Sequence, residues 1–375
     1  MKRLGRAGEG CHVISFEAVS WQNRAGDLLV DDISADIASE MTTVLLGTPR
    51  QTRQALLRLV LRLETPTTGV VKVAGVDLRR VDGLKFRRSL GWLSGPAQLF
   101  PHQSILEQVA TTARLAGTLR RDADDVAQTM LDEVEVGNTE RRPDELSSPE
   151  RVRVGLARSF VHRPSLVVLD DPFAGVDSVE RPLLRALLSR LRDDGPTTVL
   201  LATGDAEDAL ALGHRILLLL DGALVQSGSP TDILTRPTKG VESLLGAGLS
   251  LRGLAFVLVD DVPADIKAVV ALGATAAEAR RSAKRGPSSW VLVVDDDRRP
   301  VGWANTERLS ADGPVTESPL VAVRGVVHAS DTMQRALDYA VSSPSQMVPK
   351  VDDDGLVLGL FSQTTLSLHL ARVKA

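Results

Sequence analysis

A glycine-led turn between an apolar run and an amphipathic segment is the first candidate for chemistry. The apolar run Val44-Leu45-Leu46 ends at this turn, and apolar residues recur at helical spacing from Leu56 onward. A helix that begins directly after a buried strand presents its first N–H groups and the positive end of its dipole to an anion. The candidate phosphate-binding loop is Gly47, Thr48, Pro49, Arg50, Gln51, Thr52, Arg53 and Gln54.

This loop keeps only the first glycine of the phosphate-loop pattern G-x-x-x-x-G-K-[ST]. Thr52 stands for the second glycine, Arg53 for the lysine and Gln54 for the hydroxyl residue that holds Mg²⁺. Arg53 keeps the charge in a larger, planar group, and Pro49 removes one N–H donor. Two interpretations remain open: weak ATP binding through Arg50 and Arg53, or a solvated basic loop that binds no nucleotide.

Two adjacent carboxylates follow a second buried run. Leu166 to Leu169 is fully apolar and of strand length, and it ends at Asp170-Asp171. Unalternated runs such as this one, set between helical stretches, predict a parallel sheet that is buried on both faces.

The order and spacing of further segments resemble the ATP-binding subunits of ABC transporters. The resemblance covers roughly residues 13–245. The segments that carry it resemble the stretch after the Q-loop (Leu99-Phe100-Pro101-His102), the signature helix (Leu146 to Glu150, then Arg153 to Arg158), the Walker B strand (Leu166 to Phe173), the D-loop (Ala174 to Asp177) and the switch position (Thr203-Gly204-Asp205).

The resemblance implies roles for particular residues, with ATP and Mg²⁺ as cofactors. For the metal it implies Asp170, with Gly95 where the family has the Q-loop glutamine. For catalysis it implies Asp171 in place of the family's glutamate and Gly204 in place of its switch histidine. For ATP it implies the loop from Gly47 to Gln54, the signature Ser147, the D-loop Asp177 and Trp21, which could stack on adenine or be a core residue.

These departures argue against fast hydrolysis. Losing one preorganised donor typically costs ~10²–10³ in rate, and a carboxylate one methylene short misplaces the catalytic base by ~1 Å. We therefore expect an importer ATP-binding subunit with weak or absent hydrolysis, or a non-catalytic regulatory or assembly pseudo-ATPase that pairs with an intact ATPase. A free-standing sensor with a relic ATPase-like half is a third hypothesis.

An ungapped repeat occupies the C-terminal part of the chain. Val291 to Asp297 followed by Gly302 matches Val348 to Asp354 followed by Gly359, and each copy predicts a helix, a strand, an acidic turn and a strand. The repeat resembles a CBS pair. An ABC ATPase with a CBS pair is typical of glycine betaine/choline/proline (osmoprotectant) importers, which implies an adenylate or cyclic-dinucleotide ligand or a purely structural role.

Composition limits the class of protein. A net charge of −4 gives no reason to expect nucleic-acid binding. Cys11 is the only cysteine, so an intrachain disulfide is impossible and a reducing compartment fits. No run approaches the ~18 apolar residues of a membrane helix. The resemblance implies a cytoplasmic subunit, peripheral on the inner face of the membrane, that binds a permease as a homodimer or as a heterodimer with another ABC ATPase subunit.

The elements that must position these residues predict an α/β fold. We expect a mostly parallel sheet with an antiparallel β-subdomain near residues 13–40 and 67–80 and a helical subdomain near 103–160, followed by an α+β CBS pair. Asp221-Gly222 predicts a hairpin. The expected domains are residues 13–240 (nucleotide-binding domain), 241–262 (connector), 263–312 (degenerate CBS module) and 313–375 (CBS module).

Overall fold

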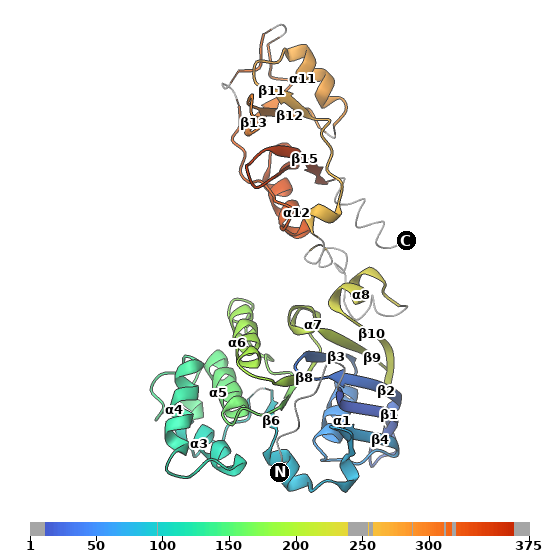
Figure 1. Cartoon of the computed structure of the whole chain (residues 1–375), viewed down its shortest axis with the longest axis vertical. Helices are drawn as coiled ribbons and strands as arrows, with labels where there is room; N and C mark the ends of the chain where they lie inside the picture. The colour runs from blue at the N-terminus through green and yellow to red at the C-terminus, as the bar shows by residue number, and fades with distance from the viewer. Residues whose placement is uncertain are drawn as a thin grey trace. The chain divides into compact units, whose positions relative to one another are not determined.

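A computed structural model of the chain describes residues 12–95, 97–238, 254, 258–286, 288–310, 313–316 and 320–363. The chain forms two compact units, Met1–Ile233 with Pro237–Leu245, and Leu234–Arg236 with Gly246–Ala375 (Figure 1). Cys11 and most of the expected connector lie outside the described residues. Among the helices of the described part, none is long and apolar enough to cross a membrane.

A six-stranded sheet forms the centre of the first unit, in the order β10-β9-β3-β8-β7-β6. All neighbours are parallel except β9 and β10, which the predicted Asp221-Gly222 hairpin joins. β7 and β8 are buried along their whole length, as expected of a parallel sheet covered on both faces. The strands are β3 (Thr42–Thr48), β6 (Gly91–Ser94), β7 (Leu166–Asp170), β8 (Thr198–Thr203), β9 (Arg215–Leu220) and β10 (Ala223–Gly228).

A second, antiparallel sheet has the order β2-β1-β4-β5. Helix α1 (Arg50–Val60) packs between the two sheets, because its buried leucines share one core cluster with Ile14 and Val71 of this sheet and with Leu45 and Leu166 of the parallel sheet. Both sheets therefore fix the position of the helix that follows the candidate loop. The strands are β1 (His12–Gln22), β2 (Leu28–Ala38), β4 (Thr68–Val73) and β5 (Val76–Asp77).

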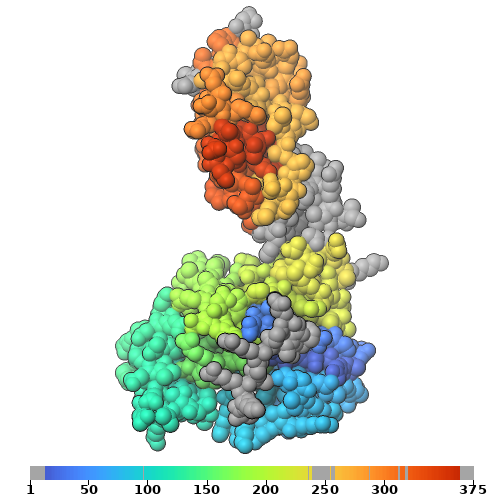
Figure 2. All heavy atoms as spheres, viewed as in Figure 1, coloured from blue at the N-terminus to red at the C-terminus, as the bar shows by residue number. Residues whose placement is uncertain are grey.

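A helical part follows, and Figures 1 and 2 show it on the side of the first unit opposite to the antiparallel sheet. Its main helices are α3 (Ile105–Ala116), α4 (Ala123–Glu133) and α5 (Ser148–Phe160), and α3 contacts both others. The predicted parallel sheet, antiparallel subdomain and helical subdomain are thus confirmed. The shorter or peripheral elements are η1 (Leu78–Arg80), α2 (Gly83–Arg88), η2 (Pro143–Glu145), α6 (Arg181–Asp193), α7 (Ala206–Leu212) and α8 (Pro230–Thr235).

The second unit contains the predicted repeat. In each copy a helix precedes an antiparallel strand pair, and the two pairs share one register, since Val291 pairs with Ala304 and Val348 with Phe361. Asp295 and Asp352 accept backbone N–H groups of their own turns, so these side chains shape the turns. The elements are η4 (Val259–Asp261), β11 (Val269–Ala271), α11 (Ala276–Ala283), β12 (Trp290–Val294), β13 (Pro300–Asn305), α12 (Met333–Ser342), β14 (Met347–Val351) and β15 (Val357–Ser362).

Gly47 is the residue of the candidate loop on which strand packing depends. Its φ is +149°, and a Cβ there would lie 1.8 Å from the carbonyl oxygen of Leu219 in β9. The first glycine of the loop therefore serves the contact between β3 and β9, whatever it does for phosphate. Because backbone atoms cannot yield as a flexible side chain can, no residue with a Cβ fits without separating the strands.

We expect Gly47→Ala to lower the free energy of unfolding by about 4 kcal/mol or more, since it breaks strand packing. Gly26→Ala is the matched control, because Gly26 has a φ of +91° with no atom within 4 Å of its Cβ position. It should cost only about 1–2 kcal/mol, the strain of a left-handed residue. Urea unfolding of the three proteins measures both losses, and equal losses would contradict the steric explanation.

Candidate functional site

Arg53, at the lysine position, lies beneath the loop. Its side chain is only 4% exposed. One guanidinium nitrogen donates to the carbonyl oxygen of Gly47, and the other, Nη2, lies 3.2 Å from Oδ2 of Asp171. The charge predicted to reach a phosphate is thus held by the loop's own backbone and by the predicted catalytic carboxylate.

Asp171 has three partners, two arginines and one backbone N–H group. Arg50 Nε lies 3.4 Å from the same Oδ2 that Arg53 contacts, and the backbone N–H of Gly204 donates to Oδ1 at 3.1 Å. Asp171 itself has a φ of +44°, a left-handed conformation at the end of β7. The strand edge therefore brings the arginines and the second carboxylate together as mutual partners.

Asp170 is held by Gln54. Nε2 of Gln54 donates to Oδ2 of Asp170 at 2.8 Å, while the buried Oδ1 has no hydrogen-bond partner among the described residues. Burial raises the pKa of Asp170, and the bond from Gln54 opposes that rise. The amide at the magnesium-hydroxyl position thus contacts the predicted metal carboxylate directly.

Glycines stand at the Q-loop and switch positions, and each lies close to a residue of the same charged cluster. A Cβ at Gly95 would lie 2.0 Å from the carbonyl oxygen of Asp171, so the glutamine side chain of the family is excluded there. A Cβ at Gly204 would lie 3.2 Å from Nη2 of Arg53. Gly204, at the switch position, therefore lies in contact with Arg53 of the loop. A histidine at residue 204 would crowd the guanidinium.

ATP and Mg²⁺, the two cofactors that the resemblance implies, do not fit this edge of the parallel sheet equally well. The first turn of α1 exposes Arg50 and Gln51, and a helix N-terminus with an arginine suits phosphate oxygens. Magnesium requires oxygen ligands, whereas the groups that face the two carboxylates are N–H donors. The hydroxyl of Thr52 is buried without a partner and so is not presented to a ligand. The structure therefore accommodates phosphates better than it accommodates the metal.

Three other predicted ATP contacts have local roles in the fold. Ser147 caps α5 in a reciprocal capping box with Glu150, whose pKa is lowered to about 2, chiefly by the bond from the Ser147 backbone N–H. Asp177 accepts from the N–H groups of Val179 and Glu180. Trp21 is partly buried against the core cluster around α1. ATP contacts for these three residues stay predictions.

A charged cluster lies beside the switch position, and it was not predicted from the sequence. Asp205 follows Gly204, caps α7 and pairs with Arg181 of α6. Nearby, Nε of Arg185 lies 2.7 Å from Oδ1 of the buried Asp208. Alternating arginines on one helix and acidic residues at the start of the next could have signalled this contact. It ties α7, and with it the segment of Gly204, to α6.

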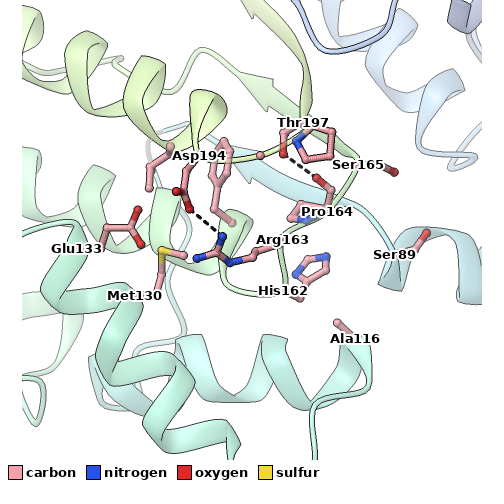
Figure 3. Close-up of a pocket in the computed structure, with 14 residues that line it drawn as sticks. Ser89, Ala116, Met130, Glu133, His162, Arg163, Pro164, Ser165, Asp194 and Thr197 are labelled. Atoms are coloured by element: carbon pink, nitrogen blue, oxygen red, sulfur yellow. Dashed lines mark hydrogen bonds and ion pairs between the residues drawn. The ribbon is translucent and has the colours of Figure 1, made fainter. Parts of the chain in front are cut away.

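A separate cavity of about 480 Å³ opens at the other end of the sheet. Pro164 and Ser165 before β7 and Thr197 before β8 line it, whereas Asp170 ends β7 and Asp171 follows it at the opposite edge. Figure 3 shows His162 beside Arg163, which pairs with Asp194 at 2.8 Å. This cavity is therefore no part of the candidate phosphate site.

Comparisons with known proteins agree with this geometry. The ABC transporter family matches residues 30–174. The glycine betaine uptake system ATP-binding protein of Escherichia coli (strain K12) is 31% identical over 60% of this chain and 76% of its own length. The osmoprotectant import ATP-binding protein of Salmonella typhimurium (strain LT2) is 25% identical over 91% of each chain.

A solved dimeric ATP-binding cassette bound to ADP and Pi shares the fold, with a TM-score of 0.53 and 21% identity over 58% of this chain and 98% of that one. The fold and the strand-edge site define an ABC-type ATP-binding domain. The chain belongs to the family of ABC transporter ATP-binding proteins, and several of its relatives over nearly the whole chain are osmoprotectant, choline and carnitine transport ATP-binding proteins.

We expect Arg53→Ala to lower the free energy of unfolding by about 2–3 kcal/mol, because it leaves the Gly47 carbonyl and part of Asp171 without a donor. Arg50→Ala is a matched control on the same carboxylate oxygen, but its side chain is 50% exposed. That variant should lose less than about 1 kcal/mol, as exposed pairs do. Urea unfolding compares them, and a larger loss in Arg50→Ala would contradict the assignment.

His162 should make stability depend on pH. Burial lowers its pKa below the ordinary value, against a smaller opposite effect of the Ser89 backbone. The unfolded chain therefore binds the proton first, and stability falls as the pH drops below about 6.5. His162→Gln should reduce this fall in urea unfolding, and a remainder should persist because the pKa of His214 is also lowered. An unchanged pH dependence in His162→Gln would exclude this residue as a cause.

Proposed function

We propose that this chain is the ATP-binding subunit of an importer for osmoprotectants such as glycine betaine, choline or proline, with weak or absent hydrolysis of its own. Support for the solute class comes from relatives that match more than 90% of the chain. In this proposal the chain works in the cytoplasm at the inner face of the membrane. It pairs with a membrane permease, as a homodimer or with a second ATPase subunit.

One observation carries the claim of weak hydrolysis. Asp171, in the position of the catalytic base, accepts from Arg53 and from the N–H of Gly204 and forms an ion pair with Arg50. A general base must accept a proton from water at hydrogen-bond distance. Both carboxylate oxygens of Asp171 already have protein partners, so an attacking water must compete with them for this carboxylate.

The same observation favours a second candidate, a regulatory or assembly pseudo-ATPase that pairs with an intact subunit. In that function the arginines and aspartates hold the fold together and nucleotide turnover occurs only at the partner's motifs. The proposal also includes that the repeat of the second unit is a CBS pair with an adenylate or cyclic-dinucleotide ligand. The two candidates differ in whether this chain alone binds ATP.

Calorimetric titration with ATP tests the binding and steady-state phosphate release tests the turnover. We expect ATP binding with turnover at least about 10²-fold below the ordinary enzyme median of ~10 s⁻¹, because the base and its supporting donors are altered. The Salmonella typhimurium relative, purified in the same way, is the positive control for the assay. Turnover equal to that relative would reject weak hydrolysis, and absent ATP binding would favour the pseudo-ATPase.

A further inference from the structure

We propose that the phosphate loop of this chain binds ATP without a metal ion, because Arg53 and Gln54 place their own N–H donors on the two carboxylates that would otherwise face magnesium. The inference rests on the proposed ATP binding and adds the chemical form of the nucleotide. It turns on three contacts at the strand edge, from Gln54 to Asp170 and from Arg50 and Arg53 to Asp171.

The contact between Gln54 and Asp170 is the first feature that disfavours magnesium at this edge. Its terminal amide lies 2.8 Å from Oδ2 of Asp170. An amide oxygen would repel a carboxylate at that distance, so the N–H₂ end must face Asp170. A magnesium ion beside Asp170 would meet two N–H groups in place of the hydroxyl oxygen that the phosphate-loop pattern supplies. In this orientation the amide presents its N–H₂ end, which offers no lone pair, at the position of a metal ligand.

The charge balance of the two arginines and two aspartates is the second feature that disfavours magnesium. Arg50 and Arg53 carry two positive charges and Asp170 and Asp171 two negative ones, so the cluster is neutral without a metal when both carboxyls are ionised. Arg53 cannot turn away cheaply, because its side chain is 4% exposed and also donates to Gly47. A divalent cation at this edge would lie against a fixed guanidinium, and burial makes that repulsion stronger than in water.

One carboxylate oxygen remains for a cation, and it is not enough. Oδ1 of Asp170 is buried without a partner among the described residues. Magnesium needs a near-octahedral set of oxygens from carboxylates, waters and phosphates. A single inward oxygen beside two guanidinium groups does not replace such a set.

The loop keeps what a phosphate chain needs. Helix α1 begins at Arg50, the side chain of Arg50 is half exposed, and the neighbouring Gln51 is exposed. The N-terminus of an 11-residue helix and a half-exposed guanidinium both favour phosphate oxygens. The protein therefore supplies from its own side chains the positive charge that magnesium supplies elsewhere in phosphoryl-transfer sites.

The test is a calorimetric titration of the full-length protein with ATP, once with excess magnesium chloride and once with EDTA. We expect the Kd to change less than about threefold between the buffers. Gln54→Thr, which frees Asp170 and restores a hydroxyl, should gain a dependence on magnesium of about tenfold or more, the effect of a contact worth ~1.4 kcal/mol. Thermal melting without nucleotide checks that the variant is folded.

The outcomes separate this inference from the proposed function. Equal binding in both buffers supports metal-free binding. Binding that needs magnesium in the wild-type protein overturns the inference and leaves the proposed ATP-binding function intact. Binding in neither buffer overturns the ATP-binding part of the proposed function itself, and the inference with it. The wild-type comparison decides the question even where Gln54→Thr does not fold.

Discussion

The ion pair between Arg53 and Asp171 is the constraint on which the rest of the phosphate edge depends. It joins the first turn of α1 to the end of β7, and both partners have little exposed side-chain surface. An unpaired charge at such a position would be costly, so neither residue can change alone. The pair therefore sets what the neighbouring positions can be: Gly204 must lack a side chain near Nη2, and Asp171 must present its carboxylate to a guanidinium.

This ion pair connects the departures from the ATPase motifs with one another. In the sequence, Arg53, Gln54 and the two glycines are separate departures from an ATPase pattern. In the structure they contact one another through Asp170 and Asp171. Restoring Gly204 to histidine alone would crowd Arg53, and restoring Gly95 to glutamine alone would clash with the backbone of Asp171. Single substitutions toward the family's residues should therefore not supply the family's chemistry, because each added side chain meets a neighbour that leaves no room for it.

Much of the fold could be predicted from the sequence. Unalternated apolar runs such as Leu166 to Leu169 predicted the buried parallel strands, Asp221-Gly222 predicted the hairpin, and the ungapped repeat predicted the matching strand pairs of the second unit. The resemblance to ABC ATP-binding subunits also implied that the loop and the carboxylates belong to one nucleotide site. The partners of Arg53 could not be predicted, because spacing places residues at an edge without fixing which way a long side chain turns. The separate roles of Ser147 and Asp177 as local caps were hidden for the same reason.

The two halves of the molecule differ in what constrains them. At the phosphate edge, charge pairing constrains the side chains. Arginines form ion pairs with an aspartate there, and a ligand must compete with those contacts. In the second unit, close packing decides, since a Cβ at Gly359 would lie 2.5 Å from Cβ of Ala264 and one at Gly302 would lie 2.9 Å from Cβ of Leu320. The glycines that mark the repeat are therefore explained by chain packing alone. The acidic turns beside them are explained by their own backbone bonds, so neither feature of the repeat requires a ligand.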